Sequence, residues 1–190
     1  ILKIHAIGKP LAPEVDLRRI AERTPGFTGA DLANVINEGA ISTARQDKKI
    51  VDQETLYHSI EKVLLGPERR SHLLSQKEKE IASYHEAGHA LIAGVLPYSD
   101  PVHKISIVSR GRAAGYTLKL PLEDRHLHSK NEFVTDLAVL LGGYAAEKIV
   151  FKELTTGAAD DLKKATDLAR RLVTEYGMSE KFGPIALGEK

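Results

Sequence analysis

The sequence contains no cysteine and no tryptophan among its 190 residues. Without cysteine it can form neither disulfides nor thiolate metal sites, so any metal must be held by His, Asp and Glu side chains. It also lacks an apolar run close to the roughly 20 residues that span a bilayer. Charge of one sign is not in excess, since 27 basic and 26 acidic side chains give a net charge of +1. Nothing in this balance favours nucleic acid as a partner.

The remaining composition is that of a folded chain. It is 42% hydrophobic and 28% charged, which suits one or two compact domains. Most apolar residues recur at helical spacing, whereas residues 103–120 alternate like a hairpin-like pair of strands around a glycine-containing turn. We therefore expect a mainly α fold with a small β element (α+β). Gly66 and Pro67 should end a helical bundle of residues 1–66. Residues 67–78 are interpreted as a linker and residues 79–190 as a second domain.

Helix starts are predicted from Ser, Thr or Asp residues that directly precede an apolar periodic run. The predicted caps are Asp16, Thr28 with Asp31, Asp52, and Ser129 with Glu132. A long helix is expected from about Ser75 to Val95, and either Asp160 or Asp161 is expected to open the last helix. On the helix after Ser129, the predicted buried stripe is Phe133, Leu137, Leu140 and Tyr144.

Within the long helix, the segment "HEAGH" places His85 and His89 four residues apart. Positions four apart differ by about 40° around a helix, so both rings can reach one cation. Glu86 lies at the edge of the same face, where its carboxylate can reach a water molecule on the metal without being a ligand. Zinc lowers the pKa of such a water to about 7. Glu86 would then take its proton as the water attacks a peptide carbonyl.

The simpler alternative is a helix that happens to carry two histidines on its surface, because so short a motif also arises by chance. The surrounding residues favour a site instead. The flanking segments are apolar or small, which predicts a buried helix, and buried polar groups need partners. Gly88 is unfavourable inside a helix, which suggests that another backbone packs closely at this position.

A catalytic zinc ion has three protein ligands and one open position. Glu147 shares a heptad spacing with Phe133 and Leu140, so it places a carboxylate on an otherwise apolar stripe. Asp161 follows a turn at the start of a helix, where an ordinary N-cap is an equally good interpretation. Either residue can complete the ligand set, and Glu147 also suits a hydrogen bond that orients a ligand imidazole. The residues alone leave these alternatives open.

Several separated segments, taken in order, resemble a known family. The segments "HEAGHALIAGVL", "DPVHKISIVSRGRAAGYT", "LLGGYAAEKIVF", "TTGAADDLKKATDLARRLV" and "YGMSEKFGPIAL" are similar to the peptidase domain of FtsH. These proteins are membrane-anchored, ATP-dependent zinc metalloproteases of bacteria, mitochondria and chloroplasts. The segment "TPGFTGADLANVINEGA" resembles the helical lid of their AAA+ ATPase module. The resemblance covers essentially the whole chain, and it implies an AAA+ lid bundle followed by a mostly helical zincin-type peptidase domain.

The resemblance also implies roles for individual residues. The third ligand would be the last Asp of "TTGAADD". One Zn²⁺ per chain would therefore be held by His85, His89 and Asp161, with Glu86 as the general base. Glu147 in "AAEKIV" would support the site by hydrogen bonding to a ligand. The family often has Asn at the position of Asp160. The aspartate of this chain adds a carboxylate beside the ligand, and it does not break the pattern.

The resemblance to an AAA+ lid implies a nucleotide. By matching of segments, His5, Gly29 and Ala30 would border the adenine pocket, although helix capping is the simpler interpretation of Gly29. The sequence has no Gly-x-x-x-x-Gly-Lys-[Ser/Thr] phosphate loop, so ATP and Mg²⁺ are expected to act in a longer parent protein. We expect the parent's ATPase subdomain and membrane segment to precede Ile1, and the peptidase domain to continue past Lys190.

The same resemblance implies partners and a location. The substrates would be unfolded or membrane-extracted polypeptides, and the assembly a homo- or hetero-hexamer of like subunits. The membrane-anchored parent would hold this part on the cytoplasmic side in bacteria, or within a mitochondrion or chloroplast. The strand near Ile105–Val108 is a candidate for pairing with a substrate backbone.

Two rival interpretations belong to other functional classes. One is a metal-free binding module, and the other is a metal-dependent hydrolase of small amides. Metal content separates the first from a peptidase, and a comparison of peptide with amide turnover separates the second. The other histidines carry no role in either account: His58, His72, His126 and His128 are expected to face solvent, and His103 is left open.

Overall fold

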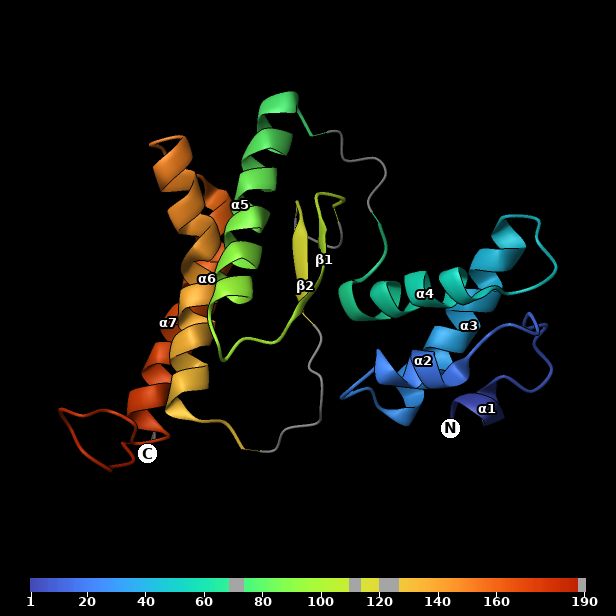
Figure 1. Cartoon of the computed structure of the whole chain (residues 1–190), viewed down its shortest axis with the longest axis horizontal. Coiled ribbons are helices and arrows are strands. Elements are labelled where there is room, and N and C mark those ends of the chain that lie inside the picture. The colour runs from blue at the N-terminus through green and yellow to red at the C-terminus, as the bar shows by residue number, and fades with distance from the viewer. Residues whose placement is uncertain (69–73, 110–113, 120–126, 188–190) are drawn as a thin grey trace. The chain divides into compact units, whose positions relative to one another are not determined.

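The computed structural model describes residues 1–68, 74–109, 114–119 and 127–187. Within these ranges the chain is mainly helical, with one two-stranded antiparallel sheet (Figure 1). This confirms the predicted α+β class. The described residues form two compact units, one within residues 1–68 and the other within residues 74–187. In the described part of the chain, no helix combines the length and the apolar character needed to cross a membrane.

The first unit is a small helical bundle of four helices, whose bounds are α1 Leu2–His5, α2 Leu17–Glu22, α3 Gly29–Arg45 and α4 Gln53–Leu65. The predicted caps are confirmed here. Asp16 accepts hydrogen bonds at the start of α2, Asp52 does so at the start of α4, and Thr28 forms a capping box at the start of α3. Gly66 ends α4 with a φ of 85°, which a residue with a side chain rarely adopts.

The core of this unit lies where α3 packs on α4. Its fully buried members are Ile20, Val35, Ile36, Val51 and Leu56, and Leu2 and Ile60 are almost fully buried. An isolated parallel bridge joins Leu11 to Val51, which the sequence did not predict. Burial of these side chains is the main source of stability for so small a bundle.

The second unit is built on two long helices, α5 Gln76–Val95 and α6 Lys130–Val150, which pack along each other (Figure 1). Both begin with capping boxes, at Ser75 and Ser129. The box at Ser129 confirms the prediction, whereas at Ser75 only the start of a helix was predicted. Between them in the chain come β1 Val102–Ser106 and β2 Tyr116–Lys119, which pair antiparallel and contact α5. A short 3-10 helix, η1 Thr156–Ala158, leads into α7 Ala159–Thr174, which packs on α6.

Helices α5 and α6 touch through their backbones at Gly88 and Gly142. A Cβ atom at Gly142 would lie 2.7 Å from the carbonyl oxygen of Gly88, and one at Gly88 would lie 2.8 Å from the Cβ of Ala146. No methyl group fits at either position unless the helices move apart. The close backbone approach predicted from Gly88 is therefore confirmed.

Three local predictions differ from the structure. Helix α7 starts at Ala159 after an N-cap at Ala158, so neither Asp160 nor Asp161 caps it. The buried line of α6 consists of Thr135, Val139, Gly142, Gly143 and Glu147, and not of the bulkier predicted stripe Phe133, Leu137, Leu140 and Tyr144, which is only half-buried. The cause is that the glycines, and not the large side chains, face α5. Strand β1 ends at Ser106, so Ile107 and Val108 lie outside it.

The glycine contact generates a prediction about stability. Gly88→Ala should lower the free energy of unfolding by about 1–3 kcal/mol, because the added methyl group meets backbone and the helices must separate. The matched control is Gly94→Ala in the same helix, where an added Cβ meets no atom within 4 Å. That variant should be neutral or stabilising by up to about 1 kcal/mol. Urea unfolding followed by circular dichroism measures both, and equal effects of the two variants would contradict the packing argument.

Candidate metal centre

The two motif histidines lie on one buried face of α5. His85 and His89 are each 8% exposed, and their Nε2 atoms are 3.0 Å apart. A helix brings residues four apart onto one face, and here that face looks into the unit and away from solvent. The alternative of two surface histidines is therefore wrong.

The other nitrogen of each ring has a partner on α6. Nδ1 of His89 lies 2.7 Å from the carbonyl oxygen of Val139, and Nδ1 of His85 lies 2.7 Å from Oε1 of Glu147. A carbonyl or carboxylate oxygen can only accept, so each Nδ1 is the donor. In a neutral imidazole the second nitrogen then carries a lone pair. Both Nε2 atoms consequently face each other as acceptors.

Asp161 brings a third acceptor to the same place. It lies in the first turn of α7, and its Oδ2 is 3.1 Å from Nε2 of His85 and 3.3 Å from Nε2 of His89. Because α7 has no side-chain cap, the carboxylate of Asp161 is free for this contact. Glu147 instead contacts Nδ1, on the opposite side of the His85 ring. Of the two residues that the spacing left as alternatives, only Asp161 therefore lies on the Nε2 side of the imidazoles.

Three ligand atoms that converge in this way need a cation between them. One atom from each of His85, His89 and Asp161 lies within 4.8 Å of the others. Two lone pairs and a carboxylate at this separation repel one another unless a metal ion or a proton lies among them. A set of two imidazoles and one carboxylate with no thiolate is a zinc donor set of the catalytic kind. The residues present therefore fit a zinc ion.

The pKa values show how the centre behaves without a metal ion. Burial alone would lower the pKa of His85, but its hydrogen bonds to Asp161 and Glu147 outweigh burial and raise it. Burial would raise the pKa of Asp161, but hydrogen bonds from His85 and His89 outweigh it and hold that pKa far below its usual range. In the metal-free state the site thus favours a proton as its cation.

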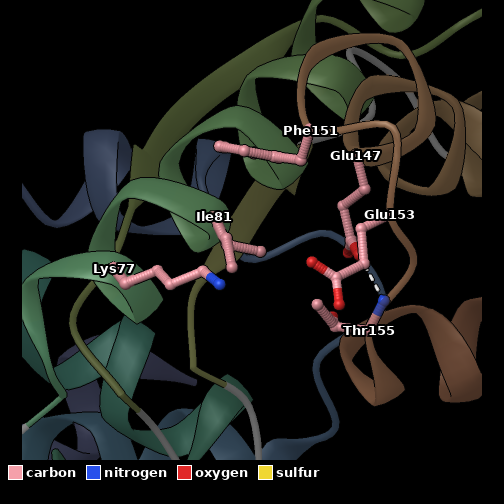
Figure 2. Close-up of a pocket in the computed structure, with 6 residues that line it drawn as sticks. All are labelled: Lys77, Ile81, Glu147, Phe151, Glu153 and Thr155. Carbon is pink, nitrogen blue, oxygen red and sulfur yellow. Dashed lines mark hydrogen bonds between the residues drawn. The ribbon is translucent and has the colours of Figure 1, made fainter.

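Glu147 is held through both of its oxygens. It is 1% exposed, with Oε1 toward His85 and Oε2 accepting a hydrogen bond of 2.9 Å from the backbone N–H of Thr155. Glu147 lines a hollow of about 220 Å³. Figure 2 shows it with the other lining residues, which are Lys77, Ile81, Phe151, Glu153 and Thr155. A carboxylate fixed in this way sets the tautomer and the orientation of the His85 ring.

Gly143 provides the space for that ring. A Cβ atom at this position would lie 2.5 Å from Cε1 and Nε2 of His85, so any larger residue would displace the imidazole. Neither this requirement nor the role of the Val139 carbonyl was predicted. The Gly142–Gly143 pair is the sequence feature that could have indicated the space needed by the His85 ring. The Val139 carbonyl is a backbone group, so no residue type in the sequence indicates its role.

Glu86 lies beside the three candidate ligands and is 7% exposed. Its Oε2 atom is 2.8 Å from the hydroxyl oxygen of Thr117 on β2. Burial raises the pKa of Glu86, while the hydrogen bond from Thr117 and the nearby imidazoles act in the opposite direction without cancelling it. A carboxylate with a raised pKa is a stronger base, which suits proton transfer near neutral pH.

The residues predicted to border a nucleotide lie in the first unit. His5 is the last residue of α1, and Gly29 and Ala30 are the exposed first residues of α3, which contacts α1. Their nucleotide role stays a prediction. Among the remaining histidines, His58 and His128 are exposed as expected, and His103 is exposed within β1. His72 and His126 lie outside the described residues.

Comparison with known proteins gives the family. The model of peptidase family M41 matches residues 72–190. The chain belongs to peptidase family M41. The model of an AAA+ lid domain matches residues 14–58. The candidate metal centre lies wholly within the M41 match, and the predicted nucleotide residues Gly29 and Ala30 lie within the lid match.

Curated relatives in this family are similar over the whole chain. The chain is 55% identical over 190 residues to the ATP-dependent zinc metalloprotease FtsH 1 of Sphaerobacter thermophilus, covering 100% of this chain and 29% of the relative. It is 53% identical over 189 residues to FtsH of Rubrobacter xylanophilus, with coverages of 100% and 29%. It is 52% identical over 190 residues to FtsH of Pseudothermotoga lettingae, with coverages of 100% and 30%. The chain therefore spans less than a third of the length of these relatives.

The support of His85 by Glu147 predicts a loss of zinc affinity in Glu147→Gln. A glutamine can accept from His85 only by turning its amide N–H₂ toward the N–H of Thr155, so one of the two hydrogen bonds fails. We expect zinc affinity to fall about 10- to 100-fold, measured by competition with a chelator. The control Glu153→Gln changes a carboxylate of the same hollow and should leave affinity unchanged. Equal affinities of wild type and Glu147→Gln would contradict this role.

The pKa shifts predict opposite pH dependences with and without metal. In the metal-free chain, the raised pKa of His85 stabilises the fold below its ordinary value of 6.5, and this is lost as pH rises through the folded-state pKa. The lowered pKa of Asp161 stabilises the fold above its ordinary 3.8, and this is lost as pH falls through its folded-state pKa. The unfolding temperature of the metal-free chain should therefore be higher between pH 3.8 and pH 6.5, the ordinary pKa values of the two groups, than at about pH 8.

The zinc-loaded chain should show the opposite trend over the same pH interval, because its ligands must be deprotonated to bind metal. Thermal unfolding with and without a chelator measures both trends. A metal-free chain that becomes more stable from about pH 5.5 to pH 8 would contradict the assignment of His85 as the group that holds the proton.

Proposed function

We propose that this chain carries the zinc endopeptidase site of an ATP-dependent metalloprotease, together with the lid of its ATPase module. The observation that carries the proposal is the convergence of Nε2 of His85, Nε2 of His89 and a carboxylate oxygen of Asp161, all acceptors, on one point. We assign these three residues as ligands of one zinc ion per chain. Glu86 is the general base, and Glu147 orients the ligand His85.

The chemistry divides between the ion and the protein. Zinc bound at this centre supplies a Lewis acid that polarises a peptide carbonyl and lowers the pKa of water to about 7. Glu86 accepts the proton of the attacking water and returns it to the leaving amine. Glu147 and the carbonyl of Val139 keep both imidazoles in the tautomer whose Nε2 is free to coordinate. Burial of the site strengthens each of these electrostatic contacts.

The proposed organisation keeps residues 1–66 as lid, residues 67–78 as linker and residues 79–190 as peptidase domain. Support comes from the two family matches, at residues 14–58 and 72–190. His5, Gly29 and Ala30 are proposed to border the adenine of ATP. The sequence has no phosphate loop, so ATP and Mg²⁺ are assigned to a parent of which this chain is one part.

The finer biological setting is part of the same proposal. The substrates are unfolded or membrane-extracted polypeptides, handled by a hexamer of like subunits that is anchored in a membrane through a segment outside residues 1–190. This part lies on the cytoplasmic side in bacteria, or inside a mitochondrion or chloroplast. The names of the relatives support ATP dependence and a zinc protease activity.

Glu86→Gln tests the mechanism. The variant keeps the shape of the side chain but cannot accept a proton, so casein cleavage should fall about 10²- to 10⁴-fold. The zinc content should remain at one per chain, because Glu86 is not a ligand. The control Glu80→Gln changes an exposed glutamate of the same helix and should retain full activity. Wild-type cleavage by Glu86→Gln would rule out Glu86 as the base.

A further inference from the structure

Glu86 needs a partner that is not the metal ion. In the proposed function it is a base and not a ligand, so coordination does not fix its carboxylate. A glutamate has several rotatable side-chain bonds, and a free carboxylate would sample many positions. Proton transfer requires one of them, because the reacting atoms must lie within hydrogen-bond reach.

The partner that the described residues provide is Thr117 on β2. Its hydroxyl oxygen lies 2.8 Å from Oε2 of Glu86 and 3.1 Å from the backbone carbonyl oxygen of the same residue. The hydroxyl therefore contacts both the backbone carbonyl and the side-chain carboxylate of Glu86. Thr117 is half-buried, where a hydrogen bond to a charged group is stronger than in water.

A second, independent feature closes the other side of the carboxylate. A Cβ atom at Gly115 would lie 2.9 Å from Cγ and 3.0 Å from Oε1 of Glu86, and 2.8 Å from the carbonyl oxygen of Ser106. The backbone at Gly115 thus forms a wall that only glycine allows so close. Thr117 holds one carboxylate oxygen while this wall limits where the other can move.

Strand β2 is itself well fixed. It pairs with β1, where Thr117 lies opposite Ile105, and its residues Tyr116 and Leu118 are buried. At its end, Nζ of Lys119 lies 3.2 Å from Oδ1 of Asp136 on α6. A hydroxyl on such a strand is a fixed reference point for a side chain on α5.

We infer that Thr117 is a positioning residue that holds the carboxylate of Glu86 in the place from which it exchanges protons with water. The inference rests on the proposed function, because Thr117 has this role only if Glu86 is the general base. It adds β2 to the elements that build the centre: the strand positions the base, whereas α6 positions the two ligand imidazoles. The hydroxyl of Thr117 bonds to Glu86 and not to the three ligands, so its effect should be on turnover and not on metal binding.

The test uses the zinc-loaded full chain with casein as substrate. Thr117→Val removes the hydroxyl and keeps the branched shape, and kcat should fall on the order of 10- to 100-fold, because the base is no longer held. KM should stay within about two-fold of wild type, and zinc content should remain at one per chain. Thr117→Ser restores the hydroxyl and should recover most of kcat. The matched control is Thr166→Val, on the exposed surface of α7, which should behave as wild type.

A crystal structure of Thr117→Val gives a readout that does not depend on activity. It should show Glu86 turned from its wild-type position, with His85 and His89 unmoved. Thr117→Ala is the second hydroxyl-free variant and should show the same loss of kcat. Wild-type kcat in either variant, loss of zinc along with activity, or an unmoved Glu86 would each overturn the inference. Failure of both variants to fold would also overturn it, because the hydroxyl would then serve the fold.

The outcomes separate this inference from the function on which it rests. A wild-type chain without zinc-dependent cleavage would overturn the proposed function itself. A wild-type chain that cleaves casein, with Glu86→Gln inactive and Thr117→Val fully active, would leave that function standing and remove only the role of Thr117.

Discussion

The direct backbone contact between Gly88 and Gly142 is the constraint on which the second unit depends. With no side chain between them, α5 and α6 approach closely enough for the Val139 carbonyl to reach His89 and for Glu147 to reach His85. Both hydrogen bonds are 2.7 Å long, so a separation of even 1 Å would break them. The same contact that packs the helices therefore also fixes the tautomers of the candidate ligands.

The centre is assembled from parts with separate tasks. Helix α5 carries the two imidazoles and Glu86 on one rigid element, α7 contributes Asp161 from its first turn, and α6 supplies the groups behind the imidazoles. Strand β2 approaches Glu86 from another direction through Thr117. Because the three acceptors repel one another without a cation, their burial is costly until a metal or a proton is bound. Metal binding and the stability of this unit are consequently coupled.

Local features of the sequence predicted most of the elements. The predicted capping boxes at Thr28 and Ser129 depend on contacts within one turn, and both are present. Contacts between distant segments were harder to predict. The buried face of α6 was misplaced because glycines carry no hydrophobic signal. The position of Asp161 at the start of a helix suggests an N-cap, although its carboxylate points to α5. Spacing alone could not choose it as the third ligand. Thr117 could not be anticipated, since the register of a hairpin is set by its packing.

The most direct test of the account is a crystal structure of the zinc-loaded chain with anomalous diffraction recorded at the zinc absorption edge. The account predicts one strong peak per chain, in contact with Nε2 of His85, Nε2 of His89 and a carboxylate oxygen of Asp161. It also predicts a fourth position left free of protein atoms, with Glu86 beside it. A peak bound by other residues, a centre closed by a fourth protein ligand, or no peak after loading with zinc would contradict it.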